Sequence, residues 1–190
     1  VVWDGSYRRY VSTTLRKVLD EKKGSSAEIN FLLASMLEKA GFDTSPVLVS
    51  TRNHGFVRQN IPVASQFNTV VCLLRLDGKS ILLDATSKYL PAGILPENCL
   101  NGSGLVISNT GYSWVKLESL EKSKLVISSD ITFSEDETLI GKVGYERTGY
   151  DAQRNRNRYF VDGEEKYLKD LAESGEWVLS KSQFENATQI

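Results

Sequence analysis

The stretch "GSSAEINFLLASMLEKAGF", residues 24–42, limits the fold of this chain more than any other segment. Its apolar residues recur three or four positions apart, which is the spacing of one face of an α-helix. Ser25 and Glu28 fit a capping box, in which each side chain binds the other residue's backbone amide. Gly41 is a typical C-terminal stop. The sequence therefore predicts a helix over residues 25–40 whose apolar face packs on another layer. That face consists of Ile29, Leu32, Leu33, Met36, Leu37 and Ala40.

A second strong signal is Asp77-Gly78, between the apolar runs "FNTVVCLLRL" and "KSILLDAT". Asp-Gly between such runs predicts a two-residue β-hairpin turn, because both residues tolerate positive φ. In this register Val71 faces Asp84, and Thr69 lies diagonal to Asp84 on the same face, roughly 7–8 Å away. Asp84 interrupts an apolar strand, where a bare carboxylate is costly, so we expect it to have hydrogen-bond partners.

Ser26 falls at helical spacing with the apolar residues, so its side chain is expected to point into the protein. The positive end of the helix dipole lies beside it, and such a place lowers the pKa of a thiol and favours an oxyanion. We therefore expect Ser26, Thr69 and Asp84 to converge where helix meets sheet. Structural interpretations also exist. Ser25 and Ser26 fit helix caps, and Asp84 fits a buried carboxylate bound by backbone amides or by the hydroxyls of Thr69 and Thr86.

The remaining segments complete an α+β pattern. We predict helices at 5–21, 150–160 and 164–174, strands at 45–51, 112–119 and 176–187, and a hairpin of 124–133 with 138–149. Residues 87–113 are rich in Pro, Gly, Asn and Ser, so they are expected to be irregular. Because the pattern of residues changes near residue 123, we expect the chain to have two parts. Residues 1–122 form helices packed on an antiparallel sheet, and residues 123–190 form part of a β-rich module with one or two helices.

Composition excludes several classes of function. The net charge of −1 gives no general attraction to nucleic acid, and no apolar run is long enough to span a bilayer. Cys72, Cys99 and the single histidine, His54, lack the spacing of metal ligands, so no metal and no cofactor is expected. Cys72 is expected to be a small buried hydrophobe and Cys99 to lie on a loop. Whether the two cysteines pair is left open.

The chain resembles the transglutaminase-like superfamily, relatives of the papain-type cysteine enzymes. The resemblance rests on "GSSAEINFLLASMLEKAGFDTSPVLVSTR", "QFNTVVCLLRLDGKSILLDAT" and "GILPENCLNGSGLVI", and it is closest to domains of large bacterial envelope proteins. In that family a cysteine begins a helix that packs on an antiparallel sheet, a histidine follows on one strand and an aspartate on the next. The resemblance places the cysteine at Ser26 and the histidine at Thr69, and only Asp84 keeps its type. It implies a papain/transglutaminase-like core over residues 1–122.

These departures imply a domain without catalysis. Threonine does not act as a general base near neutral pH, and serine without a base is a poor nucleophile. The resemblance thus implies a pseudoenzyme, a binding or scaffolding module of a bacterial cell-envelope protein, located in the periplasm or envelope. Its expected ligand is a peptide or glycan in the old active-site groove near Ser26, His54 and Thr69. The chain begins and ends mid-pattern. We therefore expect a longer protein whose flanking domains are further partners.

Two alternatives remain open from the sequence. The first is an active hydrolase or acyl transferase in which Ser26 is the nucleophile and His54, from the loop "RNHGFVR", is an unconventional base. The second is a purely structural spacer that binds no ligand.

Overall fold

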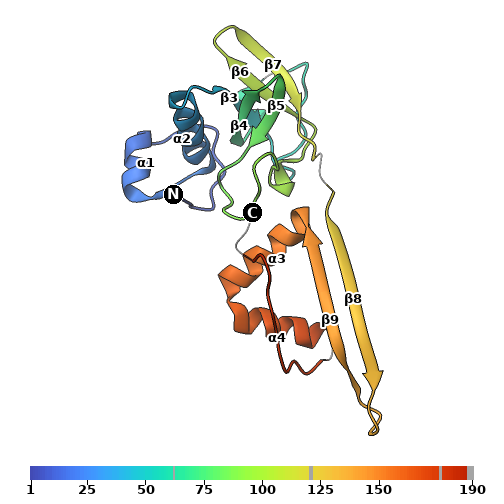
Figure 1. Cartoon of the computed structure of the whole chain (residues 1–190). Coiled ribbons are helices and arrows are strands. Elements are labelled where there is room, and N and C mark those ends of the chain that lie inside the picture. The colour runs from blue at the N-terminus through green and yellow to red at the C-terminus, as the bar shows by residue number, and fades with distance from the viewer. Residues whose placement is uncertain (62, 120–121, 176, 188–190) are drawn as a thin grey trace. The chain divides into compact units, whose positions relative to one another are not determined.

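The computed structural model describes residues 1–61, 63–119, 122–175 and 177–187. The chain is α+β and divides into two compact units, Val1–Leu120 and Glu121–Ile190 (Figure 1). The sequence predicts this boundary two residues later, between 122 and 123. Each unit is described by itself below.

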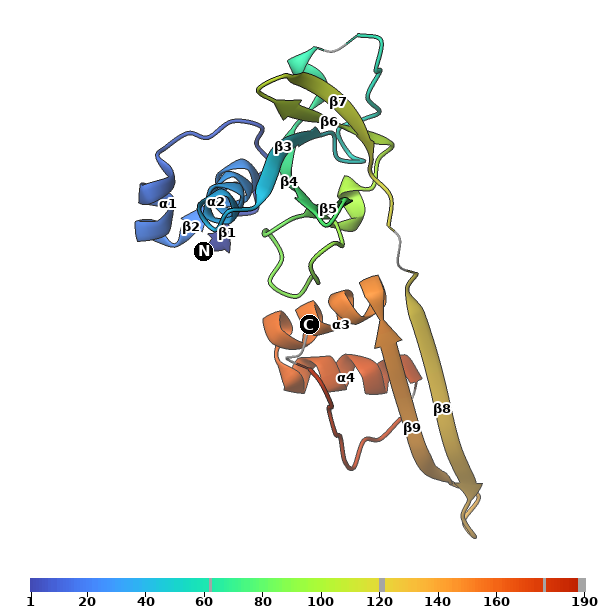
Figure 2. The same ribbon diagram turned by 45° about the horizontal axis from the view of Figure 1, so that its top comes forward.

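The N-terminal unit is built around a five-stranded antiparallel sheet in the order β5-β4-β3-β6-β7. Its strands are β3 (Asp43–Val49), β4 (Thr69–Leu76), β5 (Lys79–Leu83), β6 (Ser103–Ser108) and β7 (Gly111–Lys116). Helix α2 (Ser26–Lys39) packs against β4 and β3 (Figure 2). The remaining elements are β1 (Val2–Trp3), paired with β2 (Lys23–Gly24), helix α1 (Leu15–Glu21), and the 3-10 turns Ala64–Gln66 and Glu97–Cys99.

The predicted helix is confirmed in α2, including its capping box. The Ser25 hydroxyl accepts from the Glu28 amide, and the Glu28 carboxylate accepts from the Ser25 amide. The buried face differs from the predicted stripe, because Met36 is 59% exposed. Burial is concentrated in the first turns, where Ile29 and Leu32 lie under the sheet. The N-terminal half of α2 is therefore the part of the helix that packs against the rest of the unit.

The predicted hairpin is confirmed in β4 and β5. Asp77 and Gly78 both have positive φ, 50° and 73°, as a type I′ turn requires. The last pair before the strands separate is Cys72 with Leu83, so Asp84 follows directly after the ladder. β4 is buried along most of its length, which makes it the centre of the core.

Three predicted segments are wrong. Residues 5–14 are not helical, because amides in this segment donate to side chains of α2 instead of to carbonyls four residues earlier. The irregular segment 87–113 contains β6, whose Gly104 passes so close to β3 that an added Cβ would lie 2.6 Å from Val47. Described residues 177–187 form no strand. Instead Phe184 packs on Tyr159 and Tyr167 of two helices. Residue 176 of that prediction lies outside the described residues.

The C-terminal unit consists of one hairpin and two helices within its described residues. Strands β8 (Lys124–Phe133) and β9 (Leu139–Thr148) pair along their full length, and α3 (Gly149–Asp162) and α4 (Glu164–Gly175) follow (Figure 2). The hairpin and both helices were predicted. The sequence predicts part of a β-rich module with one or two helices, and in the described part a single ladder is accompanied by two helices of similar length.

Candidate functional site

Ser26 is the first residue of α2 and is completely buried. Its hydroxyl oxygen accepts a hydrogen bond from the Thr69 hydroxyl at 2.8 Å and another from the Arg8 amide at 2.9 Å. The Ser26 hydroxyl donates to the carbonyl oxygen of Arg8 at 3.3 Å. Ser25, and not Ser26, is the helix cap. The Ser26 proton is therefore directed to a backbone carbonyl, which is not a base.

Thr69 is the first residue of β4 and is 1% exposed. Its hydroxyl joins the start of β4 to the start of α2, so the structure brings Ser26 and Thr69 into direct contact. This contact requires the N-terminus of α2 and the start of β4 to meet at one place. They do so because β4 lies between β5 and β3 and packs against α2.

Asp84 has other partners. Its Oδ1 accepts from the amide and the hydroxyl of Thr86, and its Oδ2 accepts from the Asn30 side-chain amide at 2.9 Å. Burial raises the pKa of the Asp84 carboxyl, and the hydrogen bonds from Thr86 and Asn30 partly oppose this increase. Among the described hydrogen bonds, none joins Asp84 to Thr69. The expected Thr86 contact is present, whereas the expected Thr69 contact is replaced by Asn30.

Asn30 is a site residue that sequence reasoning missed. It is 1% exposed and lies one helical turn after Ser26. Its Nδ2 donates to the carbonyl of Val70 at 2.8 Å as well as to Asp84, and its Oδ1 accepts from the Ala85 amide at 2.9 Å. A polar residue four positions after Ser26 on a buried face was the available signal. Asn30 fixes the end of β5 against α2 and β4.

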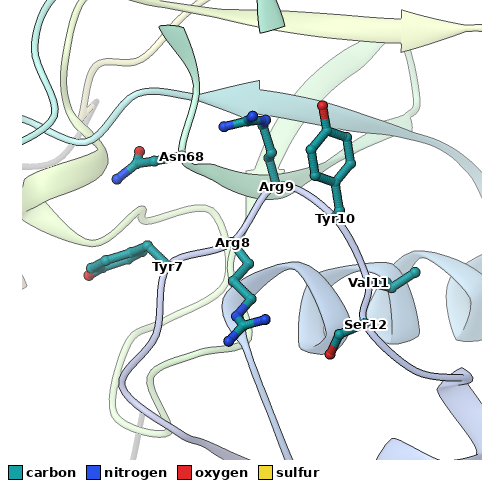
Figure 3. Close-up of a pocket in the computed structure, with 7 residues that line it drawn as sticks. All are labelled: Tyr7, Arg8, Arg9, Tyr10, Val11, Ser12 and Asn68. Atoms are coloured by element: carbon teal, nitrogen blue, oxygen red, sulfur yellow. The ribbon is translucent and has the colours of Figure 1, made fainter. Parts of the chain in front are cut away.

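Residues 6–12, which we call the strap, cross over the start of α2 (Figure 3). The Ser26 amide donates to the carbonyl of Ser6 at 3.1 Å, and the amide and hydroxyl of Ser12 donate to Glu28 at 3.0 and 2.6 Å. The strap is also bound to the segment before β4, because the Arg9 guanidinium donates to the carbonyl of Phe67 at 3.0 Å. The strap thus closes the approach to the Ser26 hydroxyl from its own side of the helix.

A shallow hollow of about 330 Å³ lies on the strap and is lined by Tyr7, Arg8, Arg9, Tyr10, Val11, Ser12 and Asn68 (Figure 3). Neither Ser26 nor Thr69 lines this hollow, and both are buried. The hollow therefore does not lie where the groove was expected, beside Ser26, His54 and Thr69. A ligand at this end of the sheet would contact the strap and Asn68 instead of the hydroxyl pair.

Glu28 is a buried carboxylate that holds the strap and the helix cap together. Its Oε1 accepts from Ser12, and its Oε2 accepts from the amide and hydroxyl of Ser25. Burial alone would raise the pKa of Glu28, but the hydrogen bonds from Ser12 and Ser25 outweigh it and lower the pKa to about 2. Glu28 is therefore charged throughout the physiological range and serves as an anchor, not as an acid.

His54 does not approach Ser26 among the described contacts. It is exposed, and its Nε2 lies 3.0 Å from the carbonyl oxygen of Ser65 in the same loop region. An imidazole in this position donates to that carbonyl, so it is not oriented as a base for Ser26. His54 is held by contacts within its own loop region.

The two cysteines are free thiols and both are buried. Burial raises the pKa of the Cys72 thiol to about 11 and raises that of Cys99 further. Both are therefore neutral near pH 7 and are not nucleophiles. Cys99 lies on the short 3-10 turn Glu97–Cys99, not on an open loop.

Comparisons with known proteins identify no relative: no family model, no curated protein and no solved structure matches the chain. Across the described ranges, no three side chains of His, Cys, Asp or Glu gather where a metal would bind. No helix in the described part of the chain has both the length and the apolarity needed to cross a bilayer. The site is thus defined by its own geometry, a buried hydroxyl pair closed by the strap.

Proposed function

We propose that residues 1–122 form a non-catalytic transglutaminase-like domain with a papain/transglutaminase-like core. The observation that carries this proposal is the 2.8 Å hydrogen bond from Thr69 to Ser26 at the start of α2. In the resembling family a histidine on a strand and a cysteine at a helix start meet in the same way. Here two hydroxyls occupy these positions, and the aspartate position, Asp84, follows the neighbouring strand. The antiparallel sheet packed on α2 supports the same relationship.

The same contacts argue against catalysis. A nucleophilic serine must pass its proton to a base, and the proton of Ser26 points to the carbonyl of Arg8. Thr69 donates to Ser26 instead of accepting from it. The strap occupies the side from which an acyl substrate would approach. Losing the base of such a unit typically reduces the rate by several orders of magnitude.

The remaining role is binding or scaffolding. By family resemblance we place the domain in the periplasm or envelope of a bacterium, as one module of a larger protein whose flanking domains are its partners. A peptide or glycan is the proposed ligand, and the strap surface with Asn68 is where it would bind, because the hydroxyl pair is buried.

Wild-type protein is expected not to react with a fluorophosphonate probe, which labels serines activated by a base. The measurement is in-gel fluorescence after incubation at pH 7 to 8, with trypsin as positive control. Labelling that disappears in both Ser26→Ala and His54→Ala would establish the alternative, an active hydrolase, and would overturn the proposal.

The double substitution Ser26→Cys with Thr69→His is expected to restore an ion pair at the old catalytic positions. A cysteine at a helix N-terminus beside an imidazole has a pKa well below the usual 8.5, so thiolate should be present at pH 7. Ser26→Cys alone should show thiolate only at a pH well above that of the double variant, because the site is buried and burial raises the pKa of a thiol. Thiolate is measured by absorbance at 240 nm against pH. The buried Cys72 and Cys99 add no signal near neutrality, because their pKa values are raised.

Absorbance at 240 nm requires no reagent to pass the strap, so the access of a reagent to the thiol does not affect the result. Circular dichroism of both variants verifies that they fold. Identical titration of the single and the double variant would show that position 69 is not a base position, and the proposed relationship to cysteine enzymes would then be wrong.

A further inference from the structure

The hollow on the strap is positively charged. Arg8 and Arg9 line it, and its other lining residues are uncharged (Figure 3). Among the described ion pairs, none includes either arginine. Glu28 does not line the hollow, and its oxygens already accept hydrogen bonds from Ser12 and Ser25. The hollow therefore presents two positive charges with which no described carboxylate pairs.

Arg9 also carries a hydrogen-bond donor without an acceptor. Its Nη1 donates to the carbonyl of Phe67 at 3.0 Å, and its guanidinium carbon lies 4.8 Å from the centre of the Tyr10 ring. Its Nε is buried, and nothing in the described part of the chain accepts a hydrogen bond from it. Such a donor is rare in folded proteins, because it has lost water without gaining a replacement. The Nε edge of Arg9 therefore lacks one acceptor, which a ligand can supply.

A carboxylate fits this edge of the guanidinium. The Nε and the neighbouring Nη2 form a fork of parallel N–H groups, and the two oxygens of a carboxylate bind such a fork together. Tyr10 is 61% exposed, so its ring can move off the guanidinium without uncovering the core. Figure 3 shows the side chains of Arg9 and Tyr10 on one side of the strap and that of Arg8 on the other. A ligand with several carboxylates therefore reaches both arginines across the strap.

The hydrogen-bonding groups of the hollow favour an acidic peptide over a glycan. The Asn68 side-chain oxygen already accepts from the Thr51 amide at 2.9 Å. The Tyr7 hydroxyl already accepts from the side-chain amide of Asn98. The hollow thus offers charged donors but few free acceptors, and a carboxylate only accepts. Each sugar unit, in contrast, brings several hydroxyl donors that need acceptors of their own.

We propose that the hollow on the strap binds an acidic peptide whose carboxylates pair with Arg8 and Arg9. This inference rests on the proposed function for the place of the ligand, and it selects a peptide over a glycan. The volume of about 330 Å³ is at the small end of the range for ligand pockets, so it fits a short segment of peptide.

The probe is a short peptide of alternating glycine and glutamate, blocked at both ends, and its neutral counterpart carries glutamine in place of glutamate. Binding to the full chain is measured by titration calorimetry at low ionic strength, where charges are least screened. The neutral peptide should bind at least about tenfold more weakly than the acidic one. Arg8→Gln should weaken binding of the acidic peptide about tenfold, because it removes one of the two charges. Arg16→Gln is the matched control, since Arg16 is exposed and outside the hollow, and it should weaken binding less than about twofold.

The contact with Arg9 has a direct readout in wild-type protein. The Nε–H signal of Arg9 in proton–nitrogen correlation spectra, assigned by triple-resonance experiments, should shift when the acidic peptide is added and stay in place with the neutral one. A purely structural role of Arg9 would leave this signal unmoved in both cases. Arg9→Lys keeps the charge but lacks the fork, so it should weaken binding of the acidic peptide about tenfold.

Equal binding of the two peptides, no binding of the acidic peptide at about 5 mM, or equal losses in Arg8→Gln and Arg16→Gln would overturn the proposal. Oligogalacturonate, an acidic glycan, is a further arm, and tighter binding of it than of the acidic peptide would contradict the choice of a peptide. Fluorophosphonate labelling of Ser26 would overturn the proposed function alone, because binding of the acidic peptide does not depend on the absence of catalysis.

Discussion

Replacing Glu28 with glutamine is expected to destabilise the N-terminal unit by about 3 kcal/mol at pH 7. Each carboxylate oxygen of Glu28 accepts from two donors, the amide and hydroxyl of Ser12 on one side and those of Ser25 on the other. Glutamine has the same shape, but its NH₂ group would face one of these donor pairs. Two donors then lose their acceptor, either the buried pair of Ser25 or the pair of Ser12 that anchors the strap. Urea unfolding followed by circular dichroism measures the change.

The pH dependence of this effect has a definite sign. The folded pKa of Glu28, about 2, lies below its ordinary value of 4.5, so the charged form is stabilised by folding. Its contribution is complete above pH 4.5 and is lost as the pH falls toward 2. The difference between wild type and Glu28→Gln should therefore shrink by about 2 kcal/mol between pH 7 and pH 3. Asp84, with the opposite shift, is present in both proteins and cancels.

Glu38→Gln is the matched control, since Glu38 lies in the same helix but is exposed. It should change the free energy of unfolding by less than about 0.5 kcal/mol. Equal effects of Glu28→Gln and Glu38→Gln would mean that the carboxylate is not what holds the strap on α2.

Local signals explain which parts of the fold the sequence predicts well. The capping box at Ser25 and Glu28 and the Asp77-Gly78 turn each depend on a few neighbouring residues, and both are present as predicted. Because the turn fixes the register, the sequence also places Thr69 and Asp84 correctly relative to the hairpin. The second hairpin and the helices after it follow from the same local rules.

The failures all involve contacts between distant segments. Residues 5–14 have a helical pattern, but the amides of Arg8 and Ser12 donate to side chains of α2 that lie 18 and 16 residues away. β6 looks like a loop because it contains Gly104, yet that glycine is what allows the strand to lie against Val47. Asn30 was read as part of an apolar helix, and its three partners lie 40 to 55 residues later in the chain. Contacts between such distant residues leave no periodic pattern in the sequence.

Replacing Asn30 with aspartate is expected to cost 3 kcal/mol or more at neutral pH, an approximate sum of two lost hydrogen bonds and one repulsion. The Nδ2 of Asn30 donates to the carbonyl of Val70 and to the carboxylate of Asp84. The new carboxylate would place an oxygen against both acceptors and a second negative charge beside Asp84, whose pKa burial already raises. The two carboxyls then share a site that only one charge can occupy.

Stability of this variant should recover as the pH falls, which separates repulsion from simple loss of packing. The repulsion raises the folded pKa of the carboxyl pair above its unfolded value, so the penalty is full at high pH and is relieved when one proton binds between about pH 7 and pH 4. Asn30→Ala removes the same hydrogen bonds without adding charge. Losing the bond to Asp84 raises the pKa of that carboxyl, so the cost of Asn30→Ala should also fall with pH, but less than that of Asn30→Asp. Asn53→Asp, on an exposed loop residue, should cost less than about 0.5 kcal/mol. Urea unfolding of the four proteins at pH 7 and pH 4 measures this, and parallel curves for Asn30→Asp and Asn30→Ala would show that Asn30 is only a packing residue beside Asp84.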